Sequence, residues 1–240
     1  MITSCSKSND EPTTKQQTCK VISVKQDNEP LSTYSYNADG KVSKVTNLYG
    51  FGDGEFKYQT GKVDFVDSKG KENQSFNIDA SGRIISDQYD TYKYNSDGYL
   101  IEKTEKSTQT TIPEFALSYT DGNLTKVVID GSSIVNIVYY DNEPIQNLLG
   151  FENAVYSSLV FNVHTFSNLT ATFIGKTSKN LVKTISTLET DQKGNSVLLK
   201  ETYTYKKDAD GKITSLTITD EAPTGYYSGT TTFNFSYQCQ

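Results

Sequence analysis

The 240-residue sequence contains no tryptophan, a single methionine and a single histidine, His164. A hydrophobic core therefore has to be built from the 17 tyrosines, the 11 phenylalanines and the branched aliphatic residues. These are the side chains that β-strands favour. The absence of tryptophan also argues against a dedicated aromatic platform for sugars. Composition and length together favour an all-β protein.

Long apolar runs and an excess of positive charge are also missing. No stretch of about 18 apolar residues occurs, so we expect no segment to cross a bilayer as a helix. The formal net charge is -6, and no basic stripe is present that could neutralise the phosphates of a nucleic acid. We therefore expect no nucleic-acid partner.

Residues typical of catalytic or metal sites are few and scattered. Three cysteines without ligand spacing do not form a zinc site, and no serine lies in a nucleophile elbow. His164 lies in the apolar stretch FNVHTF, which indicates a packed or rim histidine rather than a catalytic one. We predict no catalytic residue, metal or cofactor, and we keep a hydrolase only as the weakest alternative.

The first residues resemble a targeting signal for the cell envelope. Ile2-Thr3-Ser4-Cys5 resembles a bacterial lipobox, and the acidic SKSNDE that follows resembles the export tract of Bacteroidetes lipoproteins. The resemblance implies that Cys5 is lipidated and that residues 1–18 form a disordered tether. Because only Met1 precedes the lipobox, we expect either an upstream start or a trimmed leader. The alternative is a chance cysteine in a disordered leader.

The other two cysteines mark the ends of the expected folded part. Cys19 opens the first strand-like run, and Cys239 closes the last one. We predict a disulfide between them in an oxidising compartment, which would bring the first and last strands side by side. The chain-entropy model assigns about 5 kcal/mol to such a crosslink. The alternative is two free thiols at frayed ends.

A phrase of the form Tyr-x-Tyr-Asn-x-Asp-Gly recurs along the chain, at Tyr34–Gly40 and at Tyr92–Gly98. The asparagine suits the start of a type I turn, and the glycine suits the left-handed position that follows. We therefore interpret the phrase as a hairpin corner. Asp208 and Asp210 occupy a related corner, where weak calcium binding is the alternative, although the ligand set of an EF-hand is incomplete.

Serial hairpins of this kind predict an all-β fold over residues 19–240. We expect a large antiparallel meander of about fourteen strands, each of ordinary length, curled into a barrel or half-barrel. Residues 141–180 lack the hairpin phrase and are predicted to form an insert that covers one mouth or face of the sheet. Pro144 suits the first turn of a helix, so we predict a short helical insert near 144–160.

Two resemblances to known families follow from these motifs. The hairpin phrase resembles the YD repeats of Rhs-type proteins. The lipobox, the TCKVISV start, the serial hairpins and the insert from Asn142 to Asn180 are similar to a Bacteroidetes lipoprotein family of unknown function with a porin-like fold. This second resemblance covers residues 19–240. It implies one large, strongly curved antiparallel sheet, and it implies no known activity.

We predict a non-enzymatic, monomeric lipoprotein of the outer membrane, on its surface or its periplasmic face, that acts as a binding or scaffold module. The strands lack the lipid-facing alternation of a membrane barrel, so the anchor is the lipid alone. The partner is an unidentified protein or glycan, which Tyr226 and Tyr227 could contact, although strand-end packing explains them equally well. The alternative function is carriage of a small apolar ligand inside the curved sheet.

Overall fold

A computed structural model describes residues 18–48, 52–70, 72–107, 113–129, 131, 133–151, 172–190, 194–223 and 228–239. Sixteen β-strands lie in this described part of the chain. They are β1 (Cys19–Gln26), β2 (Ser32–Tyr36), β3 (Val42–Leu48), β4 (Gly52–Gln59), β5 (Lys62–Asp67), β6 (Glu72–Ile78), β7 (Ile84–Ser86), β8 (Asp90–Tyr94), β9 (Leu100–Glu105), β10 (Phe115–Thr120), β11 (Asn123–Ile129), β12 (Ser133–Pro144), β13 (Asn180–Thr190), β14 (Ser196–Lys207), β15 (Ile213–Glu221) and β16 (Gly229–Cys239).

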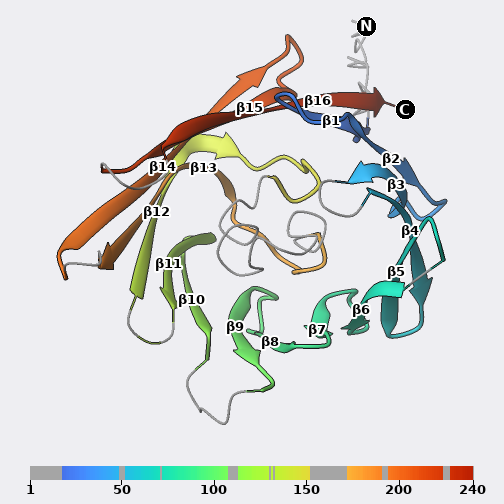
Figure 1. Ribbon diagram of the computed structural model, residues 1–240, viewed down its shortest axis with the longest axis horizontal. Helices are drawn as coiled ribbons and strands as arrows, with labels where there is room; N and C mark the ends of the chain where they lie inside the picture. The colour runs from blue at the N-terminus through green and yellow to red at the C-terminus, as the bar shows by residue number, and fades with distance from the viewer. Residues whose placement is uncertain are drawn as a thin grey trace, which may run out of the picture.

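The strands form one closed barrel in which each strand pairs with its neighbours in sequence (Figure 1). β1 closes the ring by pairing antiparallel with β16, from Cys19↔Cys239 to Gln26↔Phe233. The predicted all-β barrel is thus confirmed, while the predicted count of about fourteen strands was too low. β7 shows why short strands are hard to count, because it has three residues and pairs with β8 only at Ser86↔Thr91.

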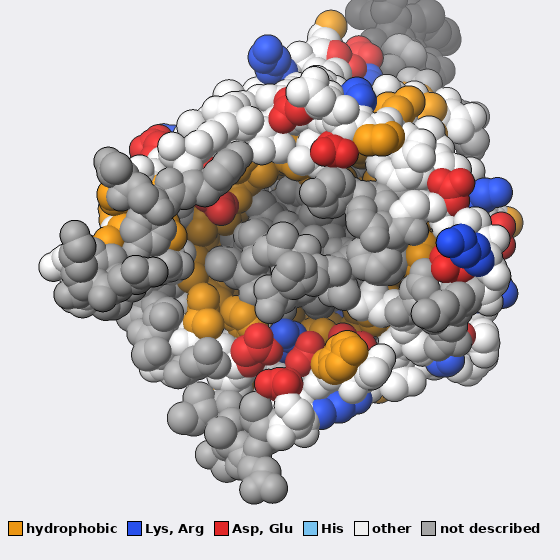
Figure 2. All heavy atoms as spheres, in the orientation of Figure 1, with side chains coloured by type: hydrophobic (Ala, Val, Ile, Leu, Met, Phe, Trp, Pro, Cys, Tyr) orange, Lys and Arg blue, Asp and Glu red, His pale blue; other side chains and the backbone are white. Residues whose placement is uncertain are grey.

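Side chains alternate between an apolar interior and a polar exterior. In β8, Tyr92 and Tyr94 face the core, so Lys93 between them faces outward, where it pairs with Glu102 of β9 at 2.5 Å. Figure 2 shows apolar side chains along the inner wall of the ring. Each of the sixteen strands in the described part of the chain contributes buried core side chains: Val21 and Val24, Tyr34, Val45, Phe56, Val63 and Phe65, Phe76, Ile84, Tyr92, Leu100, Phe115 and Leu117, Leu124 and Val127, Val135 and Ile137, Leu181, Val182 and Ile185, Tyr203, Ile213 and Leu216, and Phe235.

The connection between β12 and β13 does not begin as the predicted helix. Pro144 is the last residue of β12 and lies opposite Asn180 of β13. Leu149 and Gly150 then adopt left-handed backbone angles, with φ of 61° and 92°, which a right-handed helix cannot accommodate. The helix prediction is therefore wrong for residues 144–151, and its remainder, 152–160, lies outside the described residues.

The predicted disulfide between Cys19 and Cys239 is present, with the Cα atoms 4.0 Å apart. It joins the first residue of β1 to the last residue of β16, where the barrel closes. In the residues that the structure describes, no helix is long and apolar enough to traverse a bilayer.

Candidate functional site

The recurring phrase builds hairpin corners, as the sequence predicted. At the first corner Gly40 N–H donates to the Asn37 carbonyl at 3.0 Å, and Lys41 N–H donates to Asn37 Oδ1 at 2.9 Å. Gly40 has a φ of 78°, the left-handed angle that a Cβ would strain. Related corners lie at residues 79–83, 95–99 and 208–212. Each of these corners joins an even-numbered strand to the next odd-numbered strand of the antiparallel barrel, so they all lie at the same end.

A ring of tyrosine hydroxyls joins neighbouring corners at this end, which we call the tyrosine rim. Each hydroxyl donates to the backbone carbonyl of an apolar residue at or near the start of the preceding strand. In most of the pairs, that apolar residue lies two positions after a corner glycine. The pairs are Tyr36 with Val21, Tyr58 with Val42, Tyr94 with Ile84, Tyr119 with Leu100, Tyr139 with Leu124 and Tyr237 with Ile213. The second tyrosine of the phrase therefore ties one hairpin to the next, and burial raises the pKa of both Tyr36 and Tyr58 to about 12.

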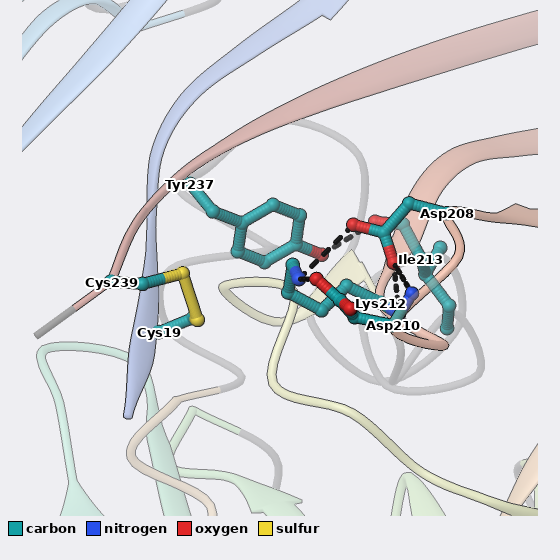
Figure 3. Close-up of a disulfide and its surroundings, with 7 residues drawn as sticks. All are labelled: Cys19, Asp208, Asp210, Lys212, Ile213, Tyr237 and Cys239. Carbon is teal, nitrogen blue, oxygen red and sulfur yellow. Dashed lines mark hydrogen bonds and ion pairs between the residues drawn. A yellow bond between two sulfur atoms is a disulfide. The ribbon is translucent and has the colours of Figure 1, made fainter. Parts of the chain in front are cut away.

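The corner at 208–212 is a turn whose carboxylates are already paired (Figure 3). Asp208 Oδ1 accepts N–H bonds from Asp210 and Lys212, at 3.0 and 2.9 Å. Lys212 Nζ lies 3.1 Å from Asp208 and 2.8 Å from Asp210. The residues are arranged as a hairpin corner rather than as a calcium loop. Within the described chain, no three His, Cys, Asp or Glu side chains are grouped so that they could hold a metal ion.

The segment between β12 and β13 enters the ring of strands (Figure 1). We call its described residues, 145–151 and 172–179, the plug. Gln146 is bound to the corner at 208–212 through both ends of its amide. Its Nε2 donates to the Gly211 carbonyl at 2.9 Å, and its Oε1 accepts from Ile213 N–H at 3.0 Å. The plug thus hydrogen-bonds a backbone carbonyl and a backbone N–H of this corner at the tyrosine rim.

The second half of the plug binds three further corners in the same way. Ile84 N–H donates to the Phe173 carbonyl at 2.9 Å, and Leu124 N–H donates to Ser178 Oγ at 3.1 Å. Two plug amides in turn donate to glycine carbonyls, Lys176 to Gly98 at 3.1 Å and Lys179 to Gly122 at 2.9 Å. These bonds fasten the plug to the rim from the start of β7 round to the start of β15.

Apolar contacts complete the attachment. The Phe173 ring centroid lies 6.2 Å from that of Phe76, in a stacked arrangement, and 6.2 Å from that of Phe56. The ring centroid of Phe151 lies 4.8 Å from that of Phe233 on β16. Leu148 is fully buried. The described residues of the plug are therefore part of the hydrophobic core of the barrel.

A cavity of about 390 Å³ remains at the tyrosine rim, between the plug and the wall of β1–β6. The wall contributes Val21, Val42, Ile78 and the rings of Tyr36 and Tyr58. The corners contribute Gly40, Ser81 and Gly82, and the plug contributes Asn147, Leu149, Thr172 and Phe173. Lys20, Lys41 and the disulfide residue Cys19 complete the described lining. This volume falls within the range of small-molecule sites.

Two lysines supply the charge of this cavity. Lys20 Nζ lies 5.1 Å from the ring centroid of Tyr36, and Lys41 Nζ lies 5.1 Å from that of Tyr58. Such distances are typical of cation–π contacts. The described lining contains no Asp or Glu. The cavity therefore combines an apolar wall with two cationic groups.

A buried lysine at the opposite end of the barrel is paired with two carboxylates. Lys103 is 4% exposed, and its Nζ lies 2.7 Å from Glu114 and 3.2 Å from Asp90. Burial raises the pKa of Asp90, and the neighbouring Lys103 opposes that rise. This cluster is a buried ion-pair network that supports β8–β10.

The site residues predicted from sequence fall mostly outside the described part of the chain. Cys5, Tyr226 and Tyr227 lie there, as does His164. Cys19 and Cys239 are brought together, and Cys19 also lines the cavity. Lys20 and Lys41 were not predicted from the sequence. One signal was present at Lys41, because a lysine directly after a corner glycine places a cation at the tyrosine rim.

Comparison with known proteins identifies the fold. No protein-family model and no curated protein matches the chain. Two solved structures are similar over 91% of this chain and 98% of their own: a porin-like protein from Bacteroides uniformis, with 17% identity, and one from Bacteroides vulgatus, with 15% identity. Both superpose with a TM-score of 0.58. The porin-like fold is thus confirmed, and identities this low carry the fold alone.

Proposed function

We propose that this chain is a non-enzymatic binding module of the bacterial cell envelope, held at the outer membrane through a lipid on Cys5. The barrel acts as a water-soluble domain and not as a channel. The observation that carries this proposal is the polarity of the barrel wall, which is apolar inside and polar outside. A membrane-spanning barrel has the opposite arrangement, with an apolar band outside and a polar lumen.

The outer face of the seam strands illustrates the polarity. Lys200 of β14 pairs with Glu221 of β15 at 3.1 Å, and Thr217 of β15 bonds Thr232 of β16 at 3.3 Å. Six large apolar residues are exposed in the described chain: Leu31, Ile85, Tyr89, Val138, Leu188 and Leu198, of which Leu188 and Leu198 lie opposite each other on β13 and β14. A few exposed apolar residues are ordinary on a water-facing surface, whereas charged pairs on the outer wall would be costly against lipid.

The plug supports the same proposal. Its hydrogen bonds to Gly98, Gly122 and Gly211 and its packing against the inner wall block the lumen at the tyrosine rim. A domain with a blocked lumen can still present its rims and loops to a partner, which we propose to be a protein or a glycan. Cys5 lies 14 residues before Cys19, the first residue of β1, so the tether would lead directly to the tyrosine rim.

The test compares the natural allele with Cys5→Ala, both expressed from the native locus with whatever precedes Met1. We expect the natural protein to incorporate labelled palmitate and to fractionate with the outer membrane. Cys5→Ala should be unlabelled and soluble without detergent, with an unchanged melting temperature. Neither form should cause liposome swelling. A Cys5→Ala protein that still needs detergent, or that permeabilises liposomes, would refute the proposal.

The cavity at the tyrosine rim favours a second candidate function. A carrier of small ligands needs a cavity, and about 390 Å³ is enough for a small molecule. This space lies between the wall and the plug rather than in an open lumen. Native mass spectrometry of protein purified from its own host would detect a retained small molecule, and an unliganded mass in every preparation would count against carriage.

A further inference from the structure

We infer that the cavity at the tyrosine rim binds a small amphipathic anion, a carboxylate with a compact apolar body. This inference rests on the second candidate function, carriage of a small ligand, and specifies the ligand class. The polarity and charge of the described lining residues define this ligand class independently of how the chain is anchored.

The apolar part of the ligand is defined by the wall and the plug. Val21, Val42 and Ile78 line the cavity from three different strands, and Leu149 and Phe173 line it from the plug. Leu149 is 3% exposed, and Phe173 packs on Phe56 and Phe76. These side chains are fixed by core packing, so the apolar surface is formed in advance and favours burial of a compact hydrocarbon or aromatic group.

The charged part of the ligand is defined by Lys20 and Lys41. Both line the cavity, and neither forms an ion pair with a carboxylate of the described chain. By contrast, Lys62, Lys93 and Lys212 at other positions have Asp or Glu partners. In a chain of net charge -6, two cations over a lining without acids are a local site of positive potential. An anion is the ligand that such a site selects.

The tyrosines reinforce this selection. The hydroxyls of Tyr36 and Tyr58 donate to the carbonyls of Val21 and Val42, so their protons are engaged within the rim. Burial also raises the pKa of both phenols to about 12, which keeps them uncharged. Their ring faces hold the lysine ammonium groups in position by cation–π attraction. The lysines are therefore the groups that meet the head of the ligand, and the tyrosines orient them.

The ligand is a monoanion rather than a polyphosphate. A nucleotide needs donors around several phosphate oxygens, usually from a glycine-rich turn at a helix N-terminus, and the described lining offers two ammonium groups beside a large apolar wall. One carboxylate satisfies the two cations while the rest of the molecule contacts the wall and the plug. Octanoate has this composition, and 1-octanol is its uncharged analogue.

Isothermal titration calorimetry of the full chain with octanoate tests the inference. We expect saturable binding at one site, weakened by added salt because the lysines are near the surface. Lys20→Gln and Lys41→Gln should each weaken octanoate binding about threefold to tenfold. The same changes should leave 1-octanol, which binds more weakly, unaffected. Lys44→Gln, on the outer wall of β3, is the matched control and should leave both affinities unchanged.

A second variant tests the location independently of charge. Ser81 lines the cavity at an exposed corner position, so Ser81→Trp should occupy part of the space and abolish octanoate binding while the melting temperature stays unchanged. The inference is overturned if octanoate does not bind, if 1-octanol binds equally well, or if the lysine or tryptophan variants bind as the natural protein does. If the natural protein in its own host carries no lipid on Cys5 but binds octanoate, the proposed anchoring alone is refuted. If it is anchored but does not bind octanoate, this inference alone is refuted.

Discussion

Removal of the Cys19–Cys239 disulfide is the perturbation whose effect the fold defines most sharply. The bond joins residues 220 positions apart, so it restricts nearly the whole unfolded chain. For a loop of this size the chain-entropy relation gives about 18 cal/mol/K, or about 5 kcal/mol of stability at room temperature. Domains are commonly stable by about 5–15 kcal/mol in total. The crosslink therefore accounts for a large part of the stability of the barrel.

The folded state should survive the loss of the bond. β1 and β16 remain paired from Lys20↔Gln238 to Gln26↔Phe233, and Tyr237 still ties β16 to the carbonyl of Ile213. The main change is in the unfolded state, which becomes more expanded. We therefore expect the Cys19→Ser/Cys239→Ser protein to show a native circular dichroism spectrum, a lower urea midpoint and a larger m-value.

Equilibrium urea denaturation with and without a reductant measures the effect. The reduced natural protein and the double variant should lose the same free energy of unfolding, up to about 5 kcal/mol. The single Cys19→Ser variant is the matched control for local packing and should equal the double variant, because either change removes the crosslink. A loss below about 1 kcal/mol, or a large difference between single and double variants, would contradict the entropic argument.

Three further changes test the rim, the wall and the buried acids. Tyr119→Phe removes the hydroxyl that donates to the Leu100 carbonyl at 2.8 Å, and should cost about 1 kcal/mol in urea denaturation. Gly54→Ala places a Cβ 2.2 Å from a ring carbon of Phe65, so thermal unfolding should show a destabilisation of about 1–3 kcal/mol. Burial raises the pKa of Glu201, so the folded state binds its proton more tightly than the unfolded state does. Stability should fall as pH rises from the ordinary carboxyl value through the folded-state pKa, and Glu201→Gln should flatten that part of the pH–stability curve.

The hairpin corners could be predicted because their information is local. Asn37 and Gly40 specify the turn through their own backbone preferences and side-chain bonds, and no distant residue is needed. The disulfide could be predicted for a related reason, since a cysteine at each end of a continuous meander can pair only if the sheet closes. β7 was harder to distinguish, because three residues are too few to show the two-residue alternation of a strand.

An insert over 141–180 was predicted from the sequence, but the contacts that fasten the plug and the cavity beside it could not be, because they depend on distant parts of the chain. Nothing in the sequence distinguishes Gln146 from other polar residues. Its hydrogen bonds to Gly211 and Ile213 form only because the folded barrel places those residues beside it. Lys20 and Lys41 likewise look like surface lysines. Closure of the barrel brings both lysines to one cavity. No pattern in the sequence around either lysine predicts that they lie together.

The corner phrase explains how a porin-like ring can be a closed domain. The tyrosine before a corner hydrogen-bonds the neighbouring hairpin. Backbone carbonyls at corner glycines accept hydrogen bonds from the plug, as at Gly98 and Gly122. Leu148, Leu149 and Ile174 are each 3% exposed or less, and burial of such a side chain contributes about 1.5–3 kcal/mol. Withdrawal of the plug would therefore cost about 4.5–9 kcal/mol from these residues alone. It would also expose the apolar inner wall of the barrel to water.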